Sequence, residues 1–323
     1  MHARRSNREV NFAGRSVLIL GGSRGLGLVI AREFANEGAR LTIAARDAVE
    51  LERAGTDLEA RGADVRMIVC DIRDRDQVQS TVDGAAARRG GIDVLVNVAG
   101  VIQVGPAACM TTGDFENAMA THFWGPLHAI VAARPHLQQS PIARIVNISS
   151  IGGKIAVPHL LPYCASKFAL TGLSEGLCAE LAQEGIRVTT VCPGLMRTGS
   201  TYNAWFKGQH RREFAWFHNA DAAPGLSIGA VRAARKIIAA CRRGDPVLVI
   251  TPAARVGVIA NAVFPQTTAR VIRLVNRLLP SSGSARAVDS RSGWQSVSSL
   301  APTFLTRSAD QATQENNEVP SWS

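Results

Sequence analysis

The sequence predicts an α/β fold: a doubly wound parallel sheet of about seven strands with helices on both faces, followed by a C-terminal helical extension. Short apolar runs rich in β-branched residues alternate with longer amphipathic segments over residues 12–252. The first such run passes into a glycine-rich turn and then into a helix pattern. With 323 residues, 46% of them hydrophobic, and a mean hydropathy of +0.06, the chain is long enough for one large domain with appendages.

The expected elements follow one another in regular alternation. Strands are expected at residues 17–20, 40–45, 65–70, 92–97, 145–150, 186–192 and 247–250. Helices are expected from the glycine turn to Gly38 and at residues 48–61, 75–89, 113–134, 163–184 and 230–242. Right-handed crossovers between parallel strands bring all the strands' C-terminal ends to one edge, where a ligand is expected.

The chain divides into four parts by composition. Residues 1–11 form a basic N-terminal arm, and residues 12–252 form the main domain, with a substrate lid at 199–225. Residues 253–280 form a basic amphipathic helical extension. Residues 281–323 contain eleven Ser among 43 residues and little aliphatic periodicity, so we expect a mostly disordered tail.

The first strand enters the run Gly21-Gly22-Ser23-Arg24-Gly25-Leu26-Gly27. A strand, a glycine turn and a helix in this order present backbone N–H groups and a positive helix end to a pyrophosphate. The spacing is G-x-x-x-G-x-G, and a purely structural turn is the alternative. We expect Gly21, Ser23, Arg24, Gly25, Leu26 and Gly27 to contact a dinucleotide.

Two arginines indicate which dinucleotide binds. NAD sites place an acid at the end of the second strand, whereas this chain has Arg46 there and Arg24 in the glycine turn. Two guanidinium groups suit a 2′-phosphate, so NADP(H) is preferred over NAD(H), with two surface arginines as the alternative. Asp71, followed by Ile72, is placed to accept from an adenine amine or to cap a helix.

Small residues close the fourth strand, and an unusual helix follows. Asn97, Ala99 and Gly100 lie where backbone approaches a ligand. In the next helix, Pro126 lacks an N–H, so the carbonyl of His122 loses its helical partner and can hold a water.

Three residues form a candidate catalytic group. Tyr163 and Lys167 stand four apart at the start of a helix and share one face, and Ser150 lies at the end of the strand before it. An ammonium beside a phenol favours the phenolate, and a hydroxyl can hydrogen-bond a substrate oxygen while the phenol exchanges a proton with it. A chance Tyr-x-x-x-Lys on a helix is the alternative.

Residues 199–225 hold six of the seventeen aromatic residues: Tyr202, Trp205, Phe206, Phe214, Trp216 and Phe217. This composition suits a lid over an apolar substrate, and packing into the sheet or a partner is the alternative. In residues 251–279, apolar residues alternate with Arg255, Arg270, Arg273 and Arg277, so this segment could rest on a membrane surface or pack on the domain.

Charge and cysteine usage exclude several classes. The net charge of +10 is concentrated in residues 226–280, where nine Lys/Arg face one Asp, but no nucleic-acid module is present. The six cysteines lack metal-ligand spacing, which favours reduced thiols and no metal site. We see no secretory signal and expect a cytoplasmic protein.

Over roughly residues 12–252 the chain resembles the classical short-chain dehydrogenase/reductase family. The motifs that carry the resemblance, in family order, are Gly21, Gly25 and Gly27, Asp71, the run 97–100, Ser150, Tyr163-x-x-x-Lys167 and Pro193-Gly194. The resemblance implies a Rossmann-type fold and Tyr163 as general acid/base. It implies that Lys167 tunes Tyr163 and holds the nicotinamide ribose, that Ser150 polarises the substrate oxygen, and that Pro193, Gly194 and Thr198 flank the nicotinamide.

Three positions depart from the family pattern. Leu20 stands for the usual Thr and Val98 for the second Asn, a joint exchange that can compensate itself. His122 stands where the family has its fourth catalytic residue, an Asn that holds a relay water partly through its carbonyl. Because Pro126 frees that carbonyl whatever the side chain, the relay can survive, the imidazole can join it, or turnover can slow.

The sequence therefore predicts an NADP(H)-dependent oxidoreductase that interconverts a carbonyl and an alcohol on an apolar substrate, with Tyr163, Ser150, Lys167 and His122 at the site. The family also implies a homo-oligomer, a dimer or tetramer, paired through the helices at 113–134 and 163–184. The alternative is a catalytically weakened NADP(H)-binding regulatory or scaffold protein.

Overall fold

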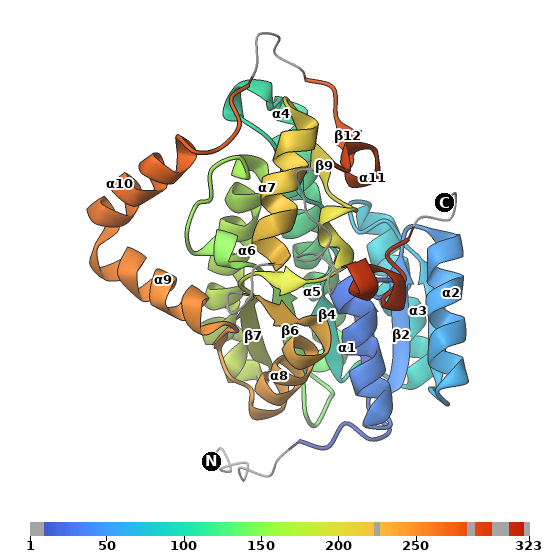
Figure 1. Cartoon of the computed structure of the whole chain (residues 1–323). Coiled ribbons are helices and arrows are strands. Elements are labelled where there is room, and N and C mark those ends of the chain that lie inside the picture. Colours follow the sequence, from blue (N-terminus) through green and yellow to red (C-terminus); the bar gives the residue numbers. More distant parts are fainter. Residues whose placement is uncertain (1–9, 223–226, 283–287, 299–309, 320–323) are drawn as a thin grey trace.

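The computed structural model describes residues 10–222, 227–282, 288–298 and 310–319. A seven-stranded, all-parallel sheet lies at its centre, in the order β11-β7-β6-β4-β1-β2-β3 (Figure 1). The strands are β1 (Ser16–Leu20), β2 (Arg40–Ala45), β3 (Val65–Val69), β4 (Val94–Asn97), β6 (Arg144–Ile148), β7 (Arg187–Cys192) and β11 (Val247–Val249). The predicted fold class is confirmed.

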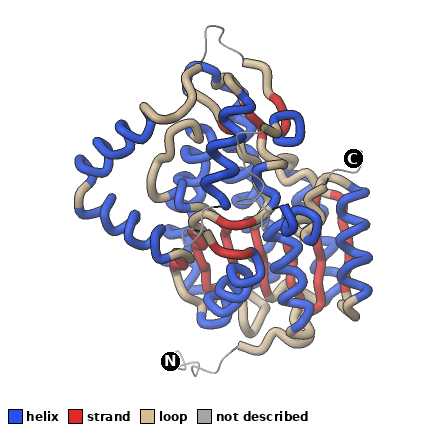
Figure 2. Tube along the Cα trace, viewed as in Figure 1, coloured by secondary structure: helices blue, strands red, loops and turns tan. Residues whose placement is uncertain are grey.

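Helices cover both faces of this sheet, as Figure 2 shows. They are α1 (Gly25–Asn36), α2 (Ala48–Ala60), α3 (Arg75–Arg89), α4 (Thr112–Met119), α5 (Gly125–Leu137), α6 (Leu161–Glu180) and α8 (Ala230–Arg243). The expected helix at 113–134 is in fact three pieces, because a π-helix (Ala120–Trp124) separates α4 from α5. Pro126, at the start of α5, cannot donate to a carbonyl in the preceding turn, and the wider π-turn accommodates it.

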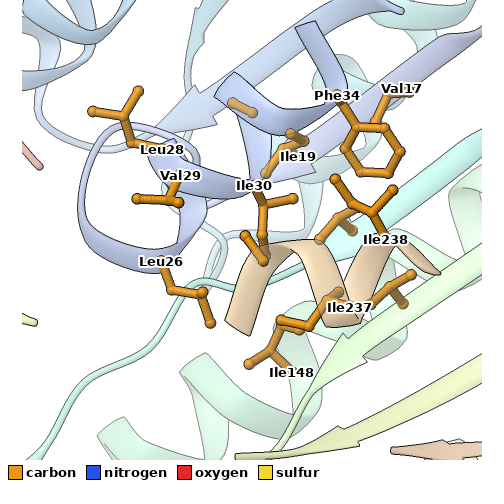
Figure 3. Packing of buried hydrophobic residues seen from close by; sticks show 14 of the residues in the cluster. Val17, Ile19, Leu26, Leu28, Val29, Ile30, Phe34, Ile148, Ile237 and Ile238 are labelled. Carbon is orange, nitrogen blue, oxygen red and sulfur yellow. The ribbon is translucent and has the colours of Figure 1, made fainter. Parts of the chain in front are cut away.

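Two apolar clusters hold the layers together, one on each face of the sheet. On one face α1 packs against α8, and Figure 3 shows Ile30 and Phe34 of α1 in one cluster with Ile237 and Ile238 of α8 and Ile19 of β1. The other face is covered by α3 and α5, which pack against each other over β1 and β4. Burial on both faces explains why the strands read as continuous apolar runs.

Short strands and one helix form the upper layer around the sheet's C-terminal edge. The strands are β5 (Gln103–Val104), β8 (Met196–Arg197), β9 (Trp205–Phe206), β10 (Ile228–Gly229) and β12 (Arg291–Ser292), and the helix is α7 (His210–Ala222). Short 3₁₀ turns lie at Ala107–Cys109, Ile151–Gly153, Leu181–Glu184 and Gly199–Thr201.

The C-terminal part leaves the domain and then returns to it. Helices α9 (Pro252–Val263) and α10 (Pro265–Asn276) project away from the sheet, and α11 (Gly293–Ser296) packs back against α7 (Figure 1). None of the helices among the described residues combines the length and apolarity that crossing a bilayer requires.

The last described segment differs from the expectation of a disordered tail. Residues 310–315 are helical, and Thr313, Asn316 and Glu318 are buried. The order comes from polar contacts with the domain, which apolar periodicity does not reveal. The remaining parts of the expected tail, and residues 1–9 of the expected N-terminal arm, lie outside the described residues.

Candidate active site

A cavity of about 340 Å³ runs along the C-terminal edge of the sheet, from the glycine turn to the start of α6. Almost every residue predicted to bind cofactor or substrate lines it. These residues are Gly21, Ser23, Arg24, Gly25, Leu26, Gly27, Arg46, Asp71, Ile72, Ala99, Gly100, His122, Ser150, Tyr163, Lys167, Pro193, Gly194 and Thr198.

Asn97 is the exception and does not line the cavity. It is buried in β4, and its amide donates to the Asn147 side chain at 2.8 Å, across to β6. Asn97 therefore joins two strands of the sheet below the cavity. The backbone N–H groups of Val98 and Ala99 both donate to the carbonyl of Leu20. This backbone link between β1 and β4 does not need the polar side chains that the family has at positions 20 and 98.

The glycine turn has no space for side chains at two of its positions. A Cβ on Gly21, whose φ is +96°, would lie 2.4 Å from the backbone nitrogen of Ala99. A Cβ on Gly27 would lie 1.9 Å from the carbonyl oxygen of Gly21. The turn is thus closed tightly over the N-terminus of α1, where backbone N–H groups and the helix dipole favour an anion.

Tyr163 and Ser150 meet at the other end of the cavity. Ser150 lies two residues after β6, as the N-cap of the 3₁₀ turn Ile151–Gly153, and its hydroxyl accepts from Gly152 N–H at 3.0 Å. Tyr163 lies in the first turn of α6. Burial raises the pKa of Tyr163 well above its usual range, and a hydrogen bond from Ser150 opposes that shift. Both residues thus line the same end of the cavity.

Lys167 lies one turn further along α6 and is buried. Its Nζ donates to the carbonyl of Ile148 at 2.8 Å and lies 5.7 Å from the centre of the Tyr163 ring. Burial lowers the pKa of Lys167 to about 7. Lys167 therefore lies beside the Tyr163 ring, while its hydrogen bond goes to a backbone carbonyl.

His122 is fully buried in the π-helix, and both its ring nitrogens have partners. Nε2 accepts from Val101 N–H at 3.1 Å, so a neutral ring carries its proton on Nδ1, which is 2.7 Å from the Ser166 hydroxyl. Burial, with Lys167 nearby, holds the pKa of His122 well below its usual value. The ring also packs edge-on against Tyr163 at 5.4 Å. These contacts fix the tyrosine's position and leave no ring nitrogen for a proton relay.

Carboxylates occupy part of the region where two arginines were expected to bind a 2′-phosphate. Arg24 is ion-paired with Glu50 of α2 at 2.9 Å, and Ser23 also hydrogen-bonds Glu50. Arg46 lines the cavity and has no ion-pair partner among the described residues. Sequence reasoning missed Glu50, whose only signal was its place three residues after the Asp47 N-cap of α2.

Asp71 lines the cavity after β3 but is not a helix cap. Its carboxylate is paired with Arg73 at 2.6 Å, and this guanidinium lowers the pKa of Asp71. The N-cap of α3 is Asp74, which accepts from the N–H groups of Asp76 and Gln77. The capping alternative is therefore wrong for Asp71.

The segment 310–319 enters the cavity from the C-terminal side. The carbonyl of Asn316 accepts the Gly25 N–H at 2.9 Å, and the Glu318 carboxylate accepts the Gly199 N–H at 2.6 Å. Burial raises the pKa of Glu318 to about 7, opposed by the Gly199 N–H and Arg24 and reinforced by Glu50 and Asp221. The Glu318 carboxylate thus lies beside the start of α1, where its Oε1 would be 3.0 Å from a Cβ on Gly25.

The aromatic residues of the expected lid pack mainly on one another. Phe206, Phe214 and Phe217 are buried with Val104 and Leu160 in a third apolar cluster, and Tyr163 packs against its edge. None of the six aromatic residues lines the cavity. These side chains thus pack on one another rather than into the sheet, and Tyr163 contacts their cluster. Residues 223–225 of the expected lid lie outside the described residues.

Comparison with known proteins gives the same result from sequence and from structure. The family model described as short chain dehydrogenase matches residues 15–207. D-threitol dehydrogenase of Mycolicibacterium smegmatis is 34% identical over 198 residues, which cover 59% of this chain and 74% of that protein. Rat 17-beta-hydroxysteroid dehydrogenase 13 is 30% identical over 280 residues, covering 84% of this chain and 85% of the relative.

Solved structures of this kind include complexes with either nicotinamide dinucleotide. A short-chain dehydrogenase/reductase from Burkholderia phymatum in complex with NAD aligns with a TM-score of 0.72 and 25% identity, over 80% of this chain and 96% of that one. A blue fluorescent protein from a metagenomic library, in complex with NADPH, aligns with a TM-score of 0.64 and 28% identity, over 75% and 98%. With the family model covering the glycine turn, Ser150 and Tyr163-x-x-x-Lys167, the chain belongs to the short-chain dehydrogenase/reductase family of oxidoreductases.

Proposed function

We propose that this protein is an NADP(H)-dependent oxidoreductase that interconverts a carbonyl and an alcohol on an apolar substrate. One observation carries the proposal: the glycine turn, Ser150, Tyr163 and Lys167 line a single cavity. The tight glycine turn at the start of α1 suits a pyrophosphate group, and the Glu318 carboxylate already lies beside Gly25 there.

The residues divide the chemistry among them. A nicotinamide supplies or accepts the hydride when it is bound. Tyr163 donates a proton to the substrate oxygen in reduction and removes it in oxidation, and Ser150 donates a hydrogen bond to the same oxygen. Lys167 would hold the ribose and, when charged, favour the phenolate of Tyr163. Ile102 and Met196 give the substrate end of the cavity an apolar wall, which supports an apolar substrate.

The test is ketone-dependent oxidation of NADPH by wild type and Tyr163→Phe. The variant keeps the ring and loses the proton, so we expect kcat to fall at least about 1,000-fold while NADPH still quenches protein fluorescence. Turnover retained by Tyr163→Phe would remove the tyrosine from this role. Dinucleotide binding without turnover by wild type on any carbonyl substrate would favour a regulatory or scaffold protein.

Arg46 is proposed to select NADP(H), with Arg24 as a second guanidinium once Glu50 releases it. Arg46→Ala should weaken NADPH binding at least about tenfold and leave NADH binding within about twofold, because only NADPH carries the 2′-phosphate. Glu50→Gln should strengthen NADPH binding. Equal losses for both cofactors in Arg46→Ala would show that Arg46 does not read the 2′-phosphate.

A further inference from the structure

The helices α9 and α10 form an arm, residues 252–278, with an uncovered apolar stripe. The side chains that form it are 45–83% exposed. They are Val256, Ile259, Val263, Phe264, Val271, Leu274, Val275 and Leu278. Their spacing of three and four residues places them along one side of each helix.

Within the arm, α9 makes the contacts with the domain, and just beyond the arm the Ser281 carbonyl accepts from the Gln209 side chain at 2.9 Å. Ala254 is buried, Arg255 Nε donates to the Val249 carbonyl at 2.8 Å, and Asn261 donates to the Lys154 carbonyl at 3.2 Å. By contrast, α10 contains no buried residue and projects from the domain (Figure 1). A 12-residue helix is marginal by itself in water, so an apolar partner is needed to stabilise α10.

The charges of the arm indicate the partner. Residues 252–280 contain four arginines and no Asp or Glu. Three of them, Arg270, Arg273 and Arg277, are spaced three and four residues apart along α10 and its C-cap. They therefore form a basic row beside the apolar stripe. A second copy docked by a twofold axis would set these arginines against each other without a carboxylate between them.

We propose that the arm binds the surface of an anionic lipid membrane. The apolar stripe enters the boundary between headgroups and acyl chains, and the arginines contact lipid phosphates from the flank. Each basic side chain near such a surface contributes attraction that salt weakens. The inner side of α9 stays packed on the domain, so the main fold remains outside the bilayer.

The experiment is vesicle flotation with the full chain. We expect binding to phosphatidylcholine vesicles that contain phosphatidylglycerol, weaker binding to phosphatidylcholine alone, and a loss of binding as salt rises. Leu274→Glu should reduce binding at least tenfold, whereas Val49→Glu, an exposed apolar position on α2, should not. Arg273→Gln with Arg277→Gln should lower binding to the anionic vesicles only, with Arg232→Gln on α8 as the matched control.

Three results would overturn the membrane proposal. The first is no binding to either vesicle, and the second is equal binding of Leu274→Glu and Val49→Glu. The third is a wild-type dimer in sedimentation velocity that Leu274→Glu dissociates while vesicle binding is absent, which would assign the stripe to a second copy. Circular dichroism of each variant shows whether it is folded.

The segment 310–319 carries an independent inference, which rests on the proposed cofactor. Its Asn316 carbonyl accepts the Gly25 N–H, and its Glu318 carboxylate lies beside Gly25 and accepts the Gly199 N–H. Asp310 anchors it through the Tyr202 hydroxyl at 2.7 Å, and Asn317 through the Ser23 carbonyl at 2.9 Å. We infer that this segment is a removable cover that competes with the dinucleotide for the glycine turn, because both ligands need the same donors.

The competition is tested by NADPH titration of the full chain. Asn317→Ala with Glu318→Ala should lower the Kd for NADPH at least fivefold, and Gln314→Ala, an exposed position on the same segment, should leave it unchanged. Hydrogen exchange of residues 310–319 should become faster when NADPH binds. An unchanged or higher Kd in the double variant would overturn the cover, whereas a chain that binds neither NADPH nor NADH would instead overturn the proposed function.

Discussion

At the residue scale, the burial of Lys167 lowers the stability of the folded protein. Its ammonium is buried, with the Ile148 carbonyl as its hydrogen-bond acceptor, and burial lowers its pKa to about 7. The unfolded chain keeps the usual pKa, so it binds the proton more tightly than the folded chain between pH 7 and about 10. The cost of this lysine is therefore largest below pH 7 and decreases as pH rises.

Lys167→Met is accordingly expected to stabilise the protein while abolishing activity. The gain in the free energy of unfolding should be larger at pH 6 than at pH 9, by roughly 3 kcal/mol. Urea unfolding at both pH values measures it, with the exposed Lys236→Met as control. A gain that does not depend on pH would show that Lys167 does not titrate in this range.

His122 is a positioning residue by its contacts. It joins the loop after β4, the π-helix and α6 through Val101, Ser166 and the Tyr163 ring. Burial holds the pKa of this imidazole well below its usual value, so the ring is neutral at neutral pH.

His122→Asn should therefore lower kcat without changing the shape of its pH profile. An amide is too short to reach both Val101 and Ser166, so Tyr163 should be held less firmly and kcat should fall roughly tenfold. His122→Gln, which is longer, should recover part of the rate. Loss of one limb of the pH profile in His122→Asn would instead make the imidazole a participant in proton transfer.

At the scale of elements, replacing either of two helical glycines by alanine is expected to have opposite effects on stability. A Cβ on Gly27 would meet the Gly21 carbonyl at 1.9 Å, whereas a Cβ on Gly172, exposed within α6, meets nothing within 4 Å. Glycine inside a helix costs stability relative to alanine unless the space is needed.

Gly172→Ala should raise the free energy of unfolding by about 0.5–1 kcal/mol, and Gly27→Ala should lower it and abolish dinucleotide binding. Thermal unfolding and NADPH titration of the two variants provide the comparison. Retained NADPH affinity in Gly27→Ala would mean that the turn can open without loss of its anion site.

The sequence predicted the elements well and their side-chain partners poorly. The inner strands could be predicted because burial on both faces leaves uninterrupted apolar runs. The π-helix could not, since Pro126 shows that the helix must adjust but not by which route. The aromatic segment after β7 was identified by composition alone, which does not distinguish a lid from a cluster that packs on itself.

At the scale of the whole molecule, apolar side chains are exposed on α5 and α6, the two helices through which subunits are predicted to pair. Val131 of α5 and Phe168 of α6 are 60% and 43% exposed. We expect Val131→Glu to shift a homo-oligomer to smaller species in sedimentation velocity, because a buried charge at an interface is costly. The same species distribution for Val131→Glu and Val49→Glu would exclude this surface from the interface.

At this scale the candidate site was predictable where its parts follow strand ends and not where distant segments meet. The cavity brings together the predicted glycine turn, Ser150 and Tyr163 because parallel strands end at one edge. Glu50 and Glu318 also line this cavity, but no sequence motif predicts them there. Their positions depend on how α2 and residues 310–319 pack, which no local pattern in the chain encodes.

The position of Glu318 in the chain also has a consequence in time. During synthesis the N-terminal part of a domain emerges first, so the βα units that build the glycine turn exist before residues 310–319 leave the ribosome. A nascent chain folded as far as α8, which covers α1, has its glycine turn before residues 310–319 are present. In the proposed competition, that chain can bind the dinucleotide without Glu318, and the complete chain must first release the Glu318 carboxylate.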